Sequence, residues 1–264
     1  MNLSLIENNI KKITIIFFFS YFIIGMSLVK DYGVSSDEYS SRIKGFVTLK
    51  YLGDKIAPDL TKKIQINKKI PDLKNYEQKI YGVVFEVPAS FLEIIFKISD
   101  KKNQFLLKHY MNFIVFFIAT IFFYRILLMR FKLPGLALLG SCYLILSPRI
   151  FANSFYNNKD LVFLSFFIIA SFYAIKFIQK QTLRNAIFFA IFSALAIDVR
   201  VLGIVIPFTV LSINLLKNFN QKELKKKFNV NILSIILMIC AVIIFWPYLW
   251  SAPAKNFLYA FNGM

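Results

Sequence analysis

Long runs of apolar residues recur along this chain, and they constrain its fold more than any other feature of the sequence. Most of the runs are roughly 17 to 25 residues long, which is the length that a helix needs to cross the ~30 Å hydrocarbon core of a bilayer. About seven such runs can be distinguished, at about Ile13–Val29, Phe105–Met129, Leu133–Ser147, Leu161–Phe177, Leu183–Ile197, Val201–Leu216 and Val230–Trp250. Hydrophobic residues make up 58% of the chain, whereas a soluble domain has about 45–50%. The sequence therefore predicts an all-α fold, a polytopic transmembrane bundle of about seven spans.

Lys and Arg residues are divided unequally between the two sides of the predicted bundle. The short loops on one side contain Lys11, Lys12, Arg125, Arg130, Lys132, Lys176, Lys180, Arg184, Lys217, Lys222 and Lys225 to Lys227. The short loops on the other side contain only Arg149, Lys159, Arg200 and Lys255. Because short cytoplasmic loops are enriched in Lys and Arg, we expect a cytoplasmic N-terminus and an external first loop over residues 30–104. The formal net charge of +18 is interpreted as a sign of topology and of contact with membrane lipids, and no nucleic-acid partner is expected.

The first part of the external loop, "SSDEYSSRIKGFVTLKYLG", is predicted to be an amphipathic helix that ends at Gly53. Its apolar residues recur at roughly helical spacing, and Ser35 or Ser36 can cap its first turn. Asp37 and Glu38 then lie where carboxylates complement the helix dipole. This capping role is the structural alternative to a chemical role for Asp37.

A second amphipathic helix is predicted in "YGVVFEVPASFLEIIFKI", after a Lys-rich hydrophilic stretch from Lys55 to Lys79. Glu86, Glu93 and Lys97 are assigned to its polar positions. The segment has too many charges to span the bilayer, so it is expected to lie flat on the membrane surface. Two interfacial helices in one loop indicate a lid over a site at the interface.

Acidic residues stand beside basic ones at the predicted external ends of several spans. Pro148 breaks the third span, and the turn that follows in "LSPRIFANSFYNNKDLVFLSFF" places Lys159 and Asp160 at the start of the fourth. Asp198 precedes Arg200 by two residues, and pairing with Arg200 is its simplest role. Two structural alternatives stay open, because exposed ion pairs are common and weak and Asn and Asp favour turns and caps.

The order of these features resembles the GT-C membrane glycosyltransferases of the protein O-mannosyltransferase type, a group that includes the lipid A aminoarabinose transferases. The resemblance rests on the Asp37-Glu38 pair after the first span, "SPRIFANSFYNNKD" before the fourth, "ALAIDVRVLGIVIP" between two spans and "FWPYLWSAPAKNF" at the outer end of a later span. "YGVVFEVPASFLEIIF" and "KHYMNFIVFFIATIFFYRIL" are similar to the family's second interfacial helix and second span. Relatives usually have several more spans, so residues 1–264 are expected to be the N-terminal portion of such a domain, truncated at its C-terminal end.

The resemblance implies an enzyme that takes a sugar from a polyprenyl-phosphate donor and transfers it to an acceptor hydroxyl. The acceptor would be a protein, a lipid or a glycan, and the reaction would occur at the outer (periplasmic) face of a bacterial plasma (inner) membrane. Asp37 is the candidate general base, and Glu38 is expected to position Asp37 or the acceptor. Asp160 is expected to organise nearby cations or to bind the acceptor. A direct attack of this kind inverts the anomeric centre.

The remaining candidate site residues would contact the donor or the acceptor. The donor phosphate needs fixed cations as its charge develops, and the candidates are Arg149, Lys159, Arg200 and His109. Tyr156 and Asn157 are candidate substrate-binding residues. The structural alternatives are a place in the interfacial aromatic belt for Tyr156, a turn position for Asn157 and a structural role for the single histidine.

No cofactor is expected, because no close His/Asp spacing indicates a metal site and no Gly-rich phosphate loop is present. Two other functions remain open from the sequence. A flippase or transporter for the lipid-linked sugar would place charges at mid-span and show an inverted repeat. A non-catalytic membrane assembly subunit would account for the short chain.

Overall fold

The structure is a computed structural model that describes residues 3–59, 70–218 and 224–263, with the side chains of 3–8, 218 and 224–227 left out. These residues are predominantly helical and include no strand, which confirms the all-α prediction. Part of the Lys-rich stretch from Lys55 to Lys79 lies outside the described residues, as do Lys222 and the side chains of Lys225 to Lys227.

Helices occupy all seven predicted spans. They are α1 (Leu3–Leu28), α5 (Lys101–Phe131), α6 (Pro134–Leu146), α8 (Asp160–Gln179), α9 (Leu183–Val199), α10 (Val205–Asn218) and α11 (Leu224–Phe245). Within the described ranges, four helices are long and apolar enough to cross a membrane, namely α1, α5, α8 and α11. The number rises to five if α6 and α7 (Pro148–Tyr156) form one bent span. The chain is thus a polytopic helical protein, and the full set of seven crossings stays a prediction.

The third predicted span is broken at Pro148, as the sequence indicates. Helices α6 and α7 meet there at a bend of 66°, because proline has no backbone N–H and clashes with the preceding turn. Asn112 of α5 fixes the second half of the bend by donating to the carbonyls of Asn153 (3.3 Å) and Ser154 (3.0 Å). The break directs the end of α7 and the turn before α8 to one end of the bundle.

Small residues allow the central helices to pack closely. Helix α9 packs between α8 and α11, and its Ala186, Ala190 and Ala194 are fully buried, as is common where helices approach closely in membranes. Aromatic rings fill the remaining space, for example Tyr173 stacked on Phe192 with ring centroids 5.1 Å apart. This core holds the ends of α8 and α9 at a fixed separation.

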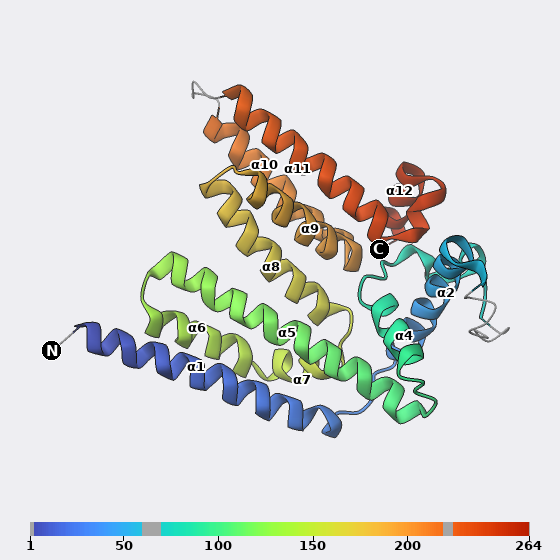
Figure 1. Ribbon diagram of the computed structural model, residues 1–264, viewed down its shortest axis with the longest axis horizontal. Helices are drawn as coiled ribbons and strands as arrows, with labels where there is room; N and C mark the ends of the chain where they lie inside the picture. Colours follow the sequence, from blue (N-terminus) through green and yellow to red (C-terminus); the bar gives the residue numbers. More distant parts are fainter. Residues whose placement is uncertain (1–2, 60–69, 219–223, 264) are drawn as a thin grey trace.

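Three shorter helices cover one end of the bundle, opposite the end where the N-terminus of α1 lies (Figure 1). They are α2 (Glu38–Ile56), α4 (Glu86–Ile95) and α12 (Pro253–Gly263). Helices α2 and α4 are the two helices predicted in the external loop, and they pack against each other. A short 3-10 helix, η3 (Glu77–Ile80), leads into the segment before α4 and contacts α12.

Helix α4 buries its acidic residues and exposes its apolar ones. Glu86 and Glu93 are buried, each with 4% of its surface exposed, whereas Phe91, Ile95 and Phe96 are more than half exposed. The cause is the neighbouring helix α2, which supplies cationic partners that the local sequence of α4 does not reveal. The exposed face of α4 is therefore apolar, and Glu86 and Glu93 lie on its polar face, which is buried against α2.

Candidate functional site

Two ion pairs lie at the end of the bundle that α2, α4 and α12 cover. Lys159 Nζ donates to Asp37 Oδ2 at 3.0 Å, and Arg200 Nη2 donates to Asp160 Oδ1. The carboxylates are the most open members, with 62% of the Asp37 side chain and 59% of the Asp160 side chain exposed. Because Lys159 and Asp160 are consecutive, the two pairs form one exposed group, which we call the four-residue cluster.

Each member of the cluster stands at the end of a helix. Asp37 directly precedes α2, Asp160 opens α8 and Arg200 directly follows α9. Residues at helix ends are held by the packed helices yet remain open to solvent. The Asp-Glu pair is thus brought to the turn before the fourth predicted span, as the sequence interpretation requires.

Asn157 holds the turn that carries Lys159 and Asp160. Its Oδ1 accepts from the backbone N–H groups of Lys159 (3.2 Å) and Asp160 (2.8 Å). Its Nδ2 donates to Asp160 Oδ2 (3.2 Å) and to Asn153 Oδ1 (3.0 Å). Both lone pairs and both N–H groups of the amide are therefore occupied. The structure places Asn157 as the residue that orients Asp160, with no capacity left for a substrate in this arrangement.

Glu38 and His109 lie beneath the cluster in the protein interior. Glu38 is fully buried, its Oε1 accepts from the Ser35 backbone N–H at 2.7 Å, and its Oε2 lies 2.8 Å from His109 Nε2. The contact with Ser35 holds the backbone that leads into α2. His109 is 2% exposed and engaged by Glu38, so it does not stand where the sequence interpretation placed a phosphate ligand. The two residues anchor the segment that carries Asp37.

Arg149 and Tyr156 are less closely connected to the cluster. Arg149 is exposed on the first turn of α7 and forms no ion pair within the described part of the chain. Tyr156 ends α7, and its ring centroid lies 6.2 Å from that of Tyr32. No hydrogen bond between described residues joins either side chain to the four-residue cluster.

Asp198 does not pair with Arg200, which corrects the expectation from their spacing. Its side chain is fully buried and its Oδ1 accepts from the Val84 backbone N–H at 2.8 Å. Gly82 permits this approach, because a Cβ at that position would stand 1.7 Å from the Asp198 carbonyl oxygen. Asp198 lies just beyond the predicted span Leu183–Ile197, and burial raises its pKa to about 7. Asp198 thus ties the segment before α4 to the end of α9.

Tyr81 is a member of the site that the sequence interpretation missed. Lys159 Nζ lies 5.6 Å from the centroid of its ring, and Lys44 Nζ lies 5.8 Å from the same centroid, both within cation–π range. One ammonium group is half-buried and the other is buried, so the ring separates the exposed cluster from the interior. The tyrosine is visible in the sequence, but no local pattern there connects it to Lys159.

Further charged residues are buried between α2, α4 and α5. Lys44 pairs with Glu86 at 3.5 Å, and Arg42 makes two hydrogen bonds to Glu93. The Nζ of Lys108 is buried without a hydrogen-bond partner among the residues that the structure describes. Breaking a buried pair is costly because it leaves an uncompensated charge. These pairs therefore fix α2 and α4 to each other, and the Glu38–His109 contact joins α2 to α5.

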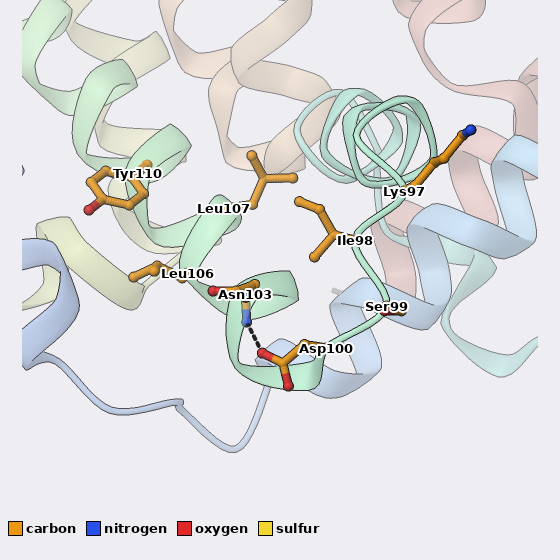
Figure 2. Close-up of a pocket in the computed structure, with 8 residues that line it drawn as sticks. All are labelled: Lys97, Ile98, Ser99, Asp100, Asn103, Leu106, Leu107 and Tyr110. Carbon is orange, nitrogen blue, oxygen red and sulfur yellow. Dashed lines mark hydrogen bonds between the residues drawn. The ribbon is translucent and has the colours of Figure 1, made fainter.

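A cavity of about 460 Å³ lies at the junction of α4 and α5. Figure 2 shows Asp100 at its edge accepting the backbone N–H of Asn103, and Leu106 and Leu107 along its wall. None of the predicted site residues lines this cavity. Within the described ranges, no group of three or more His, Cys, Asp or Glu residues could hold a metal ion.

Comparison with known proteins places the chain in a family. A family model described as dolichyl-phosphate-mannose-protein mannosyltransferase matches residues 87–246. The matched region includes Lys159, Asp160 and Arg200 but begins after Asp37 and Glu38. A search of curated proteins and a search of solved structures each found no match. Since the family model covers more than half of the chain and the helices are apolar enough to span a membrane, this integral membrane protein belongs to the dolichyl-phosphate-mannose-protein mannosyltransferase family of GT-C glycosyltransferases.

Proposed function

We propose that this protein transfers a sugar from a polyprenyl-phosphate donor to an acceptor hydroxyl at the outer face of a bacterial plasma (inner) membrane. The observation that supports the proposal most strongly is the four-residue cluster. It combines carboxylates that can accept a proton with cations that can bind a phosphate, and it draws them from three distant parts of the chain. Transfer to a hydroxyl needs both kinds of group next to each other.

Asp37 is the proposed general base. The oxygen of the acceptor hydroxyl attacks the anomeric carbon of the donor sugar, and the bond from that carbon to the phosphate oxygen breaks. The hydroxyl proton passes to the Asp37 carboxylate, and polyprenyl phosphate leaves with the bonding electron pair. The attack comes from the face opposite the phosphate, so the configuration at the anomeric carbon inverts. The open position of Asp37 allows an acceptor to reach its carboxylate.

Lys159 and Arg200 are the proposed ligands of the donor phosphate, and Arg149 is a third candidate on the exposed start of α7. In the structure both cations are paired with carboxylates, but exposed ion pairs contribute only about 0–1 kcal/mol. A phosphate can therefore displace the carboxylates from the cations. When Lys159 moves to the phosphate, Asp37 loses its cationic partner and becomes free to accept a proton.

The lipid tail of such a donor would approach from within the bilayer. Leu202, two residues beyond Arg200, is 64% exposed, and Ile204 is also exposed. The apolar outer face of α4 adds Phe91 and Phe96 at the same end of the bundle. Large exposed apolar side chains are expected where lipid tails cover the surface. We propose that lipids contact these side chains, with the N-terminus of the chain in the cytoplasm.

Transfer of label from radiolabelled polyprenyl-phosphate sugars, in membranes containing the protein, tests the proposed base. Asp37→Asn should lower the rate of transfer by at least about 100-fold, because the amide cannot accept the proton. Asp72→Asn is the matched control, since Asp72 is also an exposed carboxylate of the external loop that is paired with a lysine. Equal labelling by wild type and Asp37→Asn would remove Asp37 from the chemistry. Movement of the labelled lipid across the bilayer without transfer would support a flippase instead.

A further inference from the structure

A second cavity, of about 400 Å³, lies between η3, α12 and the segment that joins α11 to α12. Its polar lining consists of Lys79, Tyr248, Lys255, Asn256, Tyr259 and Asn262. The volume falls within the range of about 300–1,000 Å³ that is usual for ligand pockets. None of these residues belongs to the proposed catalytic site.

A short stretch of chain joins a wall of this cavity to the four-residue cluster. Lys79 precedes Tyr81 by two residues, and two residues of chain span at most about 7 Å. The ring of Tyr81 in turn lies beneath Lys159 of the cluster. Residues 79–81 therefore connect the cavity to the cluster along the chain.

The walls of the cavity are held in place by contacts among the segments that form them. Asn256 Nδ2 donates to the Tyr248 carbonyl at 2.8 Å and to Ser251 Oγ at 3.0 Å, which fixes the start of α12. Ala260 of α12 is fully buried, and a Cβ on Gly263 would stand 3.0 Å from the Ile80 side chain. The site is therefore largely formed before a ligand binds, which lowers the cost of binding.

The charge of the cavity is positive. Its lining includes two lysines and no acidic residue. Lys79 Nζ donates to the neutral carbonyl of Lys74, and neither Lys79 nor Lys255 forms an ion pair within the described part of the chain. Glu77 belongs to η3 as well, but it does not line the cavity. An anionic ligand would gain charge-assisted hydrogen bonds from both ammonium groups.

We propose that this cavity binds a sugar unit of the acceptor that carries a carboxylate or a phosphate. The faces of Tyr248 and Tyr259 can pack against the C–H surface of a sugar ring, and the Asn262 amide can bond to its hydroxyl groups. The two lysines then select the anionic group. The inference rests on the proposed function, because it assigns a substrate class to the acceptor of the same transfer reaction.

Binding of defined oligosaccharides to the full chain in nanodiscs of zwitterionic lipid tests the proposal. Trigalacturonic acid should bind at least about tenfold more tightly than neutral maltotriose, because only its carboxylates form charge-assisted hydrogen bonds with the two lysines. The double variant Lys79→Gln/Lys255→Gln should lose this preference. Lys97→Gln, a lysine that lines the other cavity, should keep it. Equal binding of the two trisaccharides, or unchanged binding by the double variant, would overturn the proposal.

A lipid headgroup could supply the same anionic chemistry, and the experiment separates the two sources. Adding phosphatidylglycerol to the nanodiscs should leave the affinity for trigalacturonic acid within about twofold. If phosphatidylglycerol abolishes the binding of trigalacturonic acid but leaves that of maltotriose unchanged, the cavity binds lipid headgroups and the proposal is overturned.

The same assays distinguish a failure of this inference from a failure of the proposed function. Asp37→Asn should bind trigalacturonic acid with unchanged affinity while it loses transfer. If Asp37→Asn transfers sugar as well as wild type but the double variant loses binding, the proposed base is wrong and the cavity assignment stands. If Asp37→Asn loses transfer and the double variant binds normally, the cavity assignment alone is wrong.

Discussion

Asp198 illustrates at the scale of single residues how burial changes a side chain's chemistry. Burial raises its pKa from 3.8 to about 7, so the folded protein holds this proton more tightly than the unfolded chain does. The free energy of unfolding should therefore fall as the pH rises from about 4 to about 7. Asp198→Asn cannot ionise, and its amide oxygen can still accept the Val84 N–H.

Thermal unfolding in detergent between about pH 5 and about pH 7, the upper part of that window, measures this effect. Wild type should lose stability as the pH rises, whereas Asp198→Asn should lose less over the same interval. Asp72→Asn, at an exposed carboxylate, should follow wild type. Identical slopes for wild type and Asp198→Asn would show that the Asp198 carboxyl does not carry the pH dependence.

The local sequence predicted the positions of some site residues but not the contacts of others. Asp160 and Pro148 both lie at helix boundaries, as predicted. A helix boundary depends on the local sequence, so both positions could be predicted. The roles of Asn157 and His109 depend on what other segments bring to them. The side-chain amide of Asn157 makes four hydrogen bonds. His109 contacts Glu38, which lies on a helix that is distant in the sequence. A pattern of neighbouring residues does not contain that information.

At the scale of helices, the contact between α2 and α4 depends on a glycine. A Cβ at Gly45 would stand 2.3 Å from Ser90 Oγ and 2.6 Å from the Glu86 carbonyl oxygen. Gly45→Ala should therefore push the two helices apart, weaken the Lys44–Glu86 pair and destabilise the fold by about 1–3 kcal/mol. The thermal unfolding temperature in detergent measures the change.

Gly33→Ala provides the matched control, because nothing lies within 4 Å of a Cβ at that position. It should unfold within about 0.5 kcal/mol of wild type, as surface substitutions usually do. A Gly45→Ala protein as stable as Gly33→Ala would mean that α2 and α4 are not in close contact.

The existence of both helices was predictable, but the orientation of α4 was not. Apolar spacing and charge counts identified α2 and α4, since helical periodicity is a local property. The same reasoning assigned Glu86 and Glu93 to the polar positions of α4, but it did not reveal what those positions contact. Lys44 and Arg42 of α2 neutralise these glutamates in the interior, and that pairing is a property of the tertiary fold.

At the scale of the whole molecule, the fold gathers three distant segments at one end of a helical bundle. The broken third span and the tight packing of α8 with α9 set the positions of Asp160 and Arg200. The buried pairs of α2, α4 and α5 set the position of Asp37. The match to the mannosyltransferase family covers the helices that position Asp160 and Arg200, but it leaves out α2, which follows Asp37 directly. The proposed function therefore depends on Asp37 belonging to the same external site.

Chemical labelling of a cysteine beside Asp37 tests that dependence most directly. In a chain whose Cys142 and Cys240 are replaced by Ser, Ser36→Cys introduces an exposed thiol next to Asp37, and Asp54→Cys introduces one near the other end of α2. A membrane-impermeant maleimide added to intact cells should label both variants. It should stop sugar transfer only in Ser36→Cys, where the adduct obstructs the site. Labelling of Ser36→Cys only after permeabilisation, or full transfer after complete labelling, would contradict an external sugar-transfer site built around Asp37.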